Sequence, residues 1–134
     1  MTLHHVGIVV QSLESWGQAY AGSLGLVPEA EIVHDPIQKV RVQFWRDDTA
    51  NLVELIEPAA PDSPVWGELK KGGGLNHLCY EVDDLERRVD DAVSGGAILA
   101  VSPVPAVAFS GRRIAFLYFR KLGLIEFVER EARP

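Results

Sequence analysis

Two stretches of the chain, LHHVGIVVQSLE at residues 3–14 and LNHLCYEVDDLE at residues 75–86, are versions of one sequence. They align when residue n is matched with residue n + 72, and the same offset holds at the far end of the repeat. The matched pairs are Leu3/Leu75, His5/His77, Val10/Val82, Leu13/Leu85, Glu14/Glu86, Phe44/Phe116, Leu52/Leu124, Glu54/Glu126 and Glu57/Glu129. Agreement at both ends of a unit at one spacing indicates an internal duplication.

Each repeat is predicted to form a strand, a helix and three further strands. The expected strands are 4–10, 28–34, 40–45 and 51–56 in the first repeat, and 77–82, 97–101, 113–119 and 122–128 in the second. Apolar residues at helical spacing mark the helices, with Leu13, Trp16, Tyr20 and Leu24 in one and Leu85, Val89, Ala92 and Val93 in the other. Ser12 and Asp83 or Asp84 are the expected N-caps, and Gly25 and Gly95–Gly96 the expected helix ends.

Neither repeat could bury its helix and one face of its sheet alone, so we predict that the two pack together. The expected fold class is α+β, with two tandem βαβββ units that pair their sheets around a metal-containing cleft. The expected organisation is a single domain over residues 1–134, with repeat unit one at about 3–58, a linker at 59–74 and repeat unit two at about 75–130. The linker contains a short predicted helix at 63–70.

Composition excludes several classes of protein. Hydrophobic residues make up 47% of the chain and charged residues 24%, which is typical of a globular core. A net charge of -6 argues against nucleic acid as a partner. A single cysteine, Cys79, leaves no internal disulfide and suits a reducing cytoplasm. No apolar run reaches the roughly 20 residues that span a bilayer, and no signal peptide is recognisable, so we expect a cytoplasmic protein without a membrane partner.

Four residues that obey the repeat offset are the predicted metal ligands: His5, Glu54, His77 and Glu126. Both histidines lie near the start of the first strand of a unit, and both glutamates lie in the last strand. Two buried carboxylates are costly unless a cation compensates them. Two imidazoles with two carboxylates suit a divalent ion such as cobalt, nickel, manganese, zinc or iron. No site for an organic cofactor is predicted.

The remaining candidate residues are interpreted as structural. His4 points to the opposite strand face from His5 and matches Asn76 in the repeat, so it is not a predicted ligand. Cys79 is expected to be a small buried thiol, and His34 to lie in a surface loop. Trp16, Trp45 and Trp66 are interpreted as core or interface residues. The run Gly72–Gly74 lacks a P-loop lysine, so it is not interpreted as a phosphate-binding loop. Lys70, Lys71, Arg112 and Arg113 are interpreted as solvated charges and not as phosphate ligands.

These motifs resemble the vicinal oxygen chelate superfamily, which includes glyoxalase I, methylmalonyl-CoA epimerase, extradiol dioxygenases and bleomycin-resistance proteins. The segments HHVGIVVQSLE, VELIEPAAPDSPV, GLNHLCYEVDDLE and GRRIAFLYFRKLGLIEFVE are most similar to the methylmalonyl-CoA epimerase branch. The resemblance implies that His5, Glu54, His77 and Glu126 are the metal positions. It also implies a small-molecule substrate, with an acyl-CoA as one candidate, and a homodimer.

One stretch departs from the epimerase branch. That branch often carries a Glu-Gln-Gly run before its third strand, and the glutamate is implicated in proton transfer. Here Gln38 matches, but Ile37 stands in place of the glutamate and Lys39 in place of the glycine.

The expected function is a metal-dependent epimerase or isomerase that abstracts a proton beside a carbonyl, with Glu126 as the catalytic base. The second proton carrier is left open among His34, Asp35 and a water molecule on the metal. The Ile37 departure keeps an alternative open, a glyoxalase-type lyase or isomerase acting on another enolisable substrate. A non-catalytic binding protein of the resistance type is a third hypothesis.

Overall fold

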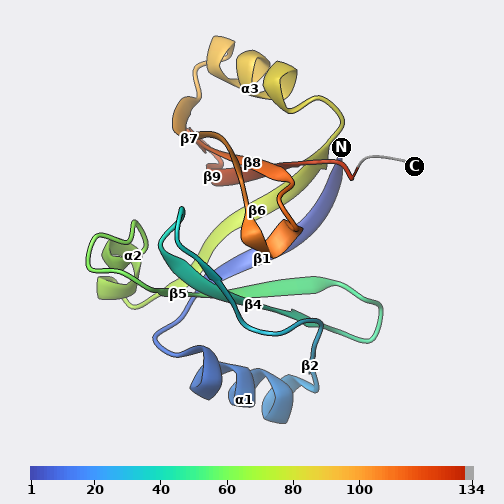
Figure 1. Cartoon of the computed structure of the whole chain (residues 1–134), viewed down its shortest axis with the longest axis vertical. Helices are drawn as coiled ribbons and strands as arrows, with labels where there is room; N and C mark the ends of the chain where they lie inside the picture. Colours follow the sequence, from blue (N-terminus) through green and yellow to red (C-terminus); the bar gives the residue numbers. More distant parts are fainter. Residues whose placement is uncertain (132–134) are drawn as a thin grey trace. The chain divides into compact units, whose positions relative to one another are not determined.

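The computed structural model describes residues 1–131. Within them the chain forms two compact units. The first unit is His5–Asn76, and the second unit combines Met1–His4 with the chain from His77 onward. Figure 1 follows the order of the elements by colour from the N-terminus. Each unit has a strand, a helix and then further strands, with three after the helix in the second unit and four in the first, which confirms the α+β class.

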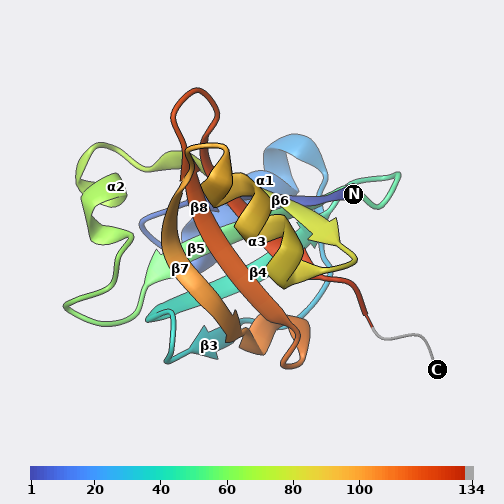
Figure 2. The same cartoon turned by 90° about the horizontal axis from the view of Figure 1, so that it is seen from above.

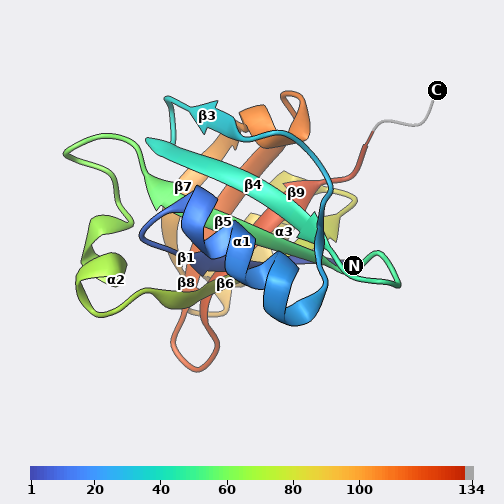
Figure 3. The ribbon, with the colours of Figure 1, turned by 90° about the horizontal axis from the view of Figure 1, so that it is seen from below.

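In the first unit the strand order is β2-β4-β5-β1, and β3 also pairs with β4. The elements are β1 (Thr2–Val9), α1 (Leu13–Leu24), β2 (Val27–Pro28), β3 (Val33–Asp35), β4 (Val40–Arg46), β5 (Leu52–Pro58) and α2 (Trp66–Lys70). β1 and β5 are parallel, and the other pairs are antiparallel. Figure 3 shows α1 lying across β4 and β5.

In the second unit the strand order is β6-β9-β8-β7. The elements are β6 (Gly74–Val82), α3 (Leu85–Ser94), β7 (Ile98–Pro105), a 3-10 turn (Val107–Phe109), β8 (Arg113–Phe119) and β9 (Gly123–Glu129). β6 and β9 are parallel, as are β1 and β5, while β8 is antiparallel to both of its neighbours. α3 packs against β7 and β8, and Figure 2 shows it in front of the sheet near β8.

Both helices begin at the predicted capping residues. Ser12 accepts a hydrogen bond from the backbone N–H of Ser15 at 3.2 Å, and Asp84 accepts one from Arg87 at 3.1 Å. These side chains satisfy amide groups that have no partner within the helix. Gly25 ends α1 in the left-handed conformation, at a φ of 70°. The predicted helix boundaries are therefore confirmed within one or two residues.

The predicted second strand of each repeat is the least accurate part of the sequence-based prediction. In place of one strand at 28–34, the structure has β2 and β3, which pair separately with β4. Pro28 has no N–H to continue a ladder, which accounts for the early end of β2. The equivalent strand β7 runs longer than predicted, to Pro105, and tolerates two prolines because it lies at the edge of its sheet.

Each unit packs its helix on a small apolar core. Leu13, Trp45 and Leu55 lie in the first core, and Leu85, Leu117 and Phe127 in the second. The expected apolar stripe of α1 is partly wrong, since Trp16 and Leu24 are exposed and the buried face uses Gly17 instead. Among residues 1–131, no helix has the length and apolar character needed to cross a membrane.

Candidate metal centre

The first unit brings His5 and Glu54 together on neighbouring parallel strands. Gly7 of β1 is the register partner of Glu54 in β5, and His5 lies two residues earlier on the same face as Gly7. The Nε2 atom of His5 lies 3.4 Å from Oε1 of Glu54. Both side chains are buried, with His5 1% and Glu54 6% exposed. The sequence therefore places one imidazole beside one carboxylate in an interior position.

The second unit repeats this arrangement with His77 and Glu126. Cys79, the repeat equivalent of Gly7, is the register partner of Glu126. The Nε2 atom of His77 lies 3.1 Å from Oε1 of Glu126, and both residues are 3% exposed. The two His–Glu pairs thus agree in strand, in register and in burial. Such agreement indicates a role common to both units.

A phenylalanine accompanies each pair. The ring of Phe44 lies 5.1 Å from that of His5 at an interplanar angle of 75°, and the ring of Phe116 lies 5.1 Å from that of His77 at 90°. In the antiparallel ladders Phe44 is opposite Glu54, and Phe116 is opposite Glu126. Edge-to-face contact of this kind fixes the plane of an imidazole. The repeat alignment matched these phenylalanines, although we did not predict them as part of the site.

The donor atoms in each pair fit a divalent cation. An imidazole nitrogen and a carboxylate oxygen are the groups that zinc, cobalt, nickel, manganese and iron share as ligands. Burial of a carboxylate is unfavourable in a medium of low polarity unless positive charge or hydrogen bonds stabilise it. A metal supplies such a charge, and each His–Glu pair is a possible part of a metal-binding group.

The turn between β3 and β4 holds the other candidate proton carriers. Asp35 is 1% exposed and accepts hydrogen bonds from the backbone N–H groups of Ile37 and Gln38, both at 3.0 Å. The side-chain amide of Gln38 donates to Asp35 as well, at 2.9 Å. Asp35 therefore stabilises the turn, whereas His34 is exposed on β3 opposite Arg41.

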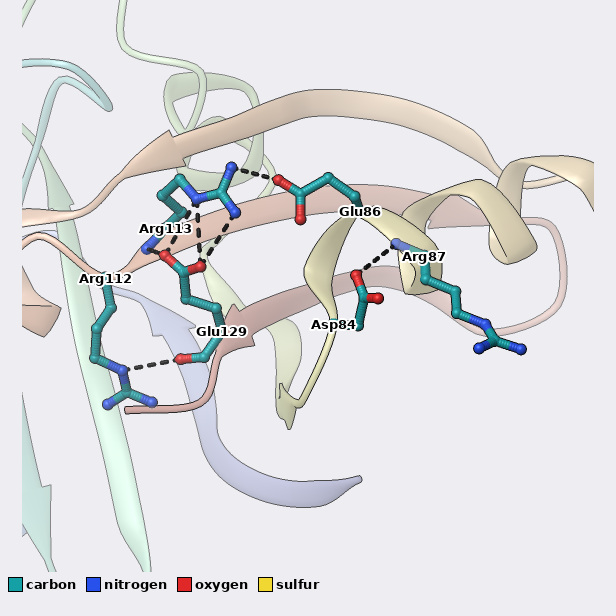
Figure 4. A network of polar contacts seen from close by, with 6 residues as sticks. All are labelled: Asp84, Glu86, Arg87, Arg112, Arg113 and Glu129. Carbon is teal, nitrogen blue, oxygen red and sulfur yellow. Dashed lines mark hydrogen bonds and ion pairs between the residues drawn. The ribbon is translucent and has the colours of Figure 1, made fainter. Parts of the chain in front are cut away.

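Several residues that we interpreted as structural have partners that fit this role. The ring of His4 meets Phe109 edge-on at 5.1 Å, and Cys79 is fully buried. Arg113 lies between Glu86 and Glu129, and Arg112 donates from Nε to the backbone carbonyl of Glu129 at 2.9 Å (Figure 4). Arg112 also pairs with the carboxylate of Glu81 at 2.6 Å, so both arginines already have carboxylate partners and are poorly placed to bind a phosphate.

Comparison with known proteins identifies a family and several relatives. Residues 4–116 match the model of the Glyoxalase/Bleomycin resistance protein/Dioxygenase superfamily. The chain is 33% identical over 118 residues to the ethylmalonyl-CoA/methylmalonyl-CoA epimerase of Cereibacter sphaeroides. The aligned region covers 87% of this chain and 87% of that relative.

Two solved structures resemble the whole chain. A hypothetical protein from Bacillus halodurans C-125 superposes with a TM-score of 0.85 at 30% identity, covering 99% of this chain and 96% of that one. The methylmalonyl-CoA epimerase from Mycobacterium tuberculosis superposes with a TM-score of 0.84 at 26% identity, covering 98% of this chain and 89% of that one. The fold is therefore shared with solved epimerases over nearly its full length.

Proposed function

Because the chain belongs to the Glyoxalase/Bleomycin resistance protein/Dioxygenase superfamily, we propose that it is a metal-dependent epimerase of an acyl-CoA. It would remove and return a proton beside the thioester carbonyl. A relative named ethylmalonyl-CoA/methylmalonyl-CoA epimerase, 33% identical over 118 residues, supports this substrate class. The observation that carries the proposal is the duplicated buried His–Glu pair in a chain so related.

The proposed metal ligands are His5, Glu54, His77 and Glu126. Two neutral imidazoles and two carboxylates would balance the charge of a divalent cation, which resolves the cost of burying the carboxylates. Cobalt, nickel, manganese, zinc and iron all accept this donor set. A small-molecule substrate would complete the coordination, and we further propose that the protein acts as a homodimer in the cytoplasm.

Proton transfer is the task of the chain's own residues. A bound divalent cation would act as a Lewis acid toward the substrate carbonyl and acidify the adjacent C–H. The carboxylate of Glu126, if it leaves the metal, would accept the proton as the C–H bond breaks. The C–H electron pair would then form a double bond to the carbonyl carbon, and the carbonyl π pair would move onto the oxygen to give an enolate. Phe116 keeps the His77 ring in place beside Glu126, and the low exposure of this pair excludes water from the carboxylate.

Return of the proton to the opposite face requires a second carrier. Asp35 is occupied by three hydrogen bonds in its turn, so it is a poor donor. His34 is exposed, and an imidazole is a common proton carrier in proteins. We therefore propose His34 or a water molecule as the second carrier.

The test is exchange of the substrate α-proton in deuterium oxide with methylmalonyl-CoA as substrate. Glu126→Gln should lower the exchange rate by about 100- to 10,000-fold, as expected for loss of a general base, while the folded structure and most metal binding remain. The matched control is Glu54→Gln, which makes the same chemical change at the repeat-equivalent position and should retain more exchange than Glu126→Gln. Equal rates in Glu126→Gln and the parent chain would rule out the proposed base.

A second candidate function is a lyase or isomerase of another enolisable substrate. The observation that favours it is Ile37, an aliphatic residue 55% exposed on the turn where the epimerase pattern has a glutamate. If the metal-loaded chain binds its ion but exchanges no proton of methylmalonyl-CoA, this second function is favoured. If it binds no ion after careful reconstitution, both enzymatic proposals fail.

A further inference from the structure

A pocket with a volume of about 720 Å³ lies in the first unit between α1 and α2. Its floor is formed where β1 and β5 end, and its walls include Trp16 and Tyr20 from α1 and Trp66 and Leu69 from α2. The pocket belongs to His5–Asn76 alone, and the proposed metal ligands do not line it.

Two half-exposed tryptophans give the pocket its character. Trp16 is 39% exposed and Trp66 is 37% exposed, although we interpreted both as core or interface residues. The indole Nε1 of Trp66 donates to the carbonyl of Ala60 at 2.7 Å, so its ring is held in place. Aromatic side chains around a pocket are suited to stacking a flat heterocycle, and a nucleobase is the common example in proteins.

Two lysines are next in sequence to residues that line the pocket. Lys70 and Lys71 lie between Leu69 and Gly72, which both line it. Both lysines are exposed, and neither forms an ion pair within residues 1–131. In a chain of net charge -6, two adjacent cations beside an aromatic pocket suit a phosphate group.

Glu57, the carboxylate that lines the pocket, should repel a bound phosphate only weakly. Glu57 accepts a hydrogen bond from the backbone N–H of Leu13 at 2.8 Å and pairs with Arg41. Its charge is therefore compensated inside the first unit.

The glycine run that follows Lys71 passes close to the end of β1. Gly73 has a φ of 72°, and a Cβ added there would lie 2.6 Å from the backbone oxygen of Val9. Only glycine therefore allows the chain to pass so close to β1. The run Gly72–Gly74, which has no phosphate-cradle motif, instead closes one side of the pocket.

The pocket lies within reach of the first half of the metal centre. Val9 and Pro58, at the pocket, follow His5 and Glu54 by four residues in β1 and β5. At about 3.3 Å per residue the separation is roughly 13 Å. Because Ile8 faces α1 whereas His5 faces the opposite side, a ligand joining the two places must pass around the strand ends. A flexible pantetheine arm is able to do this.

We propose that this pocket binds the nucleotide end of a CoA thioester, with the adenine between Trp16 and Trp66 and the phosphates on Lys70 and Lys71. This inference rests on the proposed function, since it assumes that the substrate carries CoA. It adds a site that fixes the substrate class while lying apart from the reacting carbon.

The direct test uses adenosine 3′,5′-bisphosphate, which carries the base and a phosphate but no thioester. Titration should change the tryptophan fluorescence of the metal-loaded protein. Trp16→Ala should weaken binding by about tenfold, as for loss of one stacked ring. The double substitution Lys70→Ala/Lys71→Ala should weaken binding by about tenfold and reduce its dependence on salt. No fluorescence change and no calorimetric binding in the parent chain would overturn the site.

Matched controls lie on the second unit. Tyr118→Ala removes an exposed aromatic ring and Lys121→Ala removes an exposed lysine, both far along the sequence from the pocket. Each should leave the affinity for the bisphosphate unchanged. Equal weakening by these controls and by the pocket variants would show a non-specific effect, and the inference would fail.

Kinetics separate this inference from the proposed function. If both hold, Trp16→Ala raises KM for methylmalonyl-CoA about tenfold with little change in kcat, and the parent chain prefers methylmalonyl-CoA over the methylmalonyl thioester of pantetheine. Equal kcat/KM for the two thioesters would contradict the proposed nucleotide site but not the proposed epimerase activity. Binding of the bisphosphate without exchange of the α-proton of any CoA ester would contradict the proposed epimerase activity but not the proposed nucleotide site.

Discussion

The two units share their polar and metal-site contacts but differ in the core beneath their helices. An arginine on the fourth strand of the first unit, Arg41, contacts Glu14 and Glu57, and its repeat equivalent Arg113 contacts Glu86 and Glu129. The His–Glu–Phe sets are also equivalent. Beneath the helices, however, the first unit packs Gly17 against Trp45, whereas the second has Val89 and Leu117 at those positions. The duplication therefore preserved charge and site chemistry more closely than core shape.

The core difference gives the largest expected effect on stability. A Cβ at Gly17 would lie 2.6 Å from Cζ2 of Trp45, so Gly17→Val should destabilise the protein by about 3 kcal/mol. The double variant Gly17→Val/Trp45→Leu reproduces the pair found in the second unit. It should regain most of this loss, because it also removes the indole Nε1 of Trp45, which is buried and has no hydrogen-bond partner in the described part of the chain.

Urea unfolding of the four chains in this cycle measures the coupling between positions 17 and 45. The reciprocal control is Val89→Gly/Leu117→Trp in the second unit, compared with Val89→Gly alone. If Gly17→Val and Trp45→Leu were additive, the two units would differ for reasons other than packing.

The same comparison shows which features of the fold and of the candidate site the sequence predicts. The apolar spacing predicted both helices, and their caps were predicted at Ser12 and at Asp83 or Asp84, of which Asp84 is the cap. The repeat offset predicted the residues of each His–Glu pair. It also matched Phe44 with Phe116 without revealing their contacts with the histidines. The pocket beside α2 was not predictable, since it depends on where a five-residue helix outside the repeat packs.

Two residues with left-handed backbone conformations at equivalent turns predict a smaller change in the free energy of unfolding. Lys39 has a φ of 61°, and its repeat equivalent Gly111 has a φ of 88°. A residue with a Cβ in this region is strained by about 1 kcal/mol relative to glycine. Lys39→Gly should therefore stabilise the chain by about 1 kcal/mol, and Gly111→Lys should destabilise it by a similar amount, in urea unfolding.

The control for this pair of variants is Lys39→Ala. It removes the ion pair between Lys39 and Asp62 but keeps a Cβ at the strained position. No gain is expected from it, because the ion pair is exposed and the strain remains. A gain equal to that of Lys39→Gly would show that the lysine side chain, and not the backbone conformation, limits stability at this turn.

The smallest expected effect concerns the duplicated arginines and depends on pH. A hydrogen bond from Arg113 lowers the pKa of Glu86 below its usual value. Burial tends to raise the pKa of Glu129, but hydrogen bonds from Arg113 outweigh it and the net pKa is lowered. In the first unit the pKa of Glu14 is lowered, first by a backbone hydrogen bond and then by Arg41. Arg113 therefore lowers the pKa of two carboxyls, and for Glu86 it is the main cause, whereas Arg41 is the second cause for Glu14.

Lowered carboxyl pKa values stabilise the folded chain above the unfolded value of about 4.5, and that stabilisation is lost as pH falls through the folded pKa. Arg113→Gln should therefore lower the urea midpoint at pH 7, and the difference from the parent chain should shrink as the pH is brought below about 4.5. Arg41→Gln should show the same trend with smaller size, and Arg88→Gln, at an exposed position of α3, should show none. A deficit in Arg113→Gln that persists unchanged into acid would mean that this arginine stabilises the second unit by packing of its aliphatic stem, and the charge network would then differ between the two repeats as much as the core does.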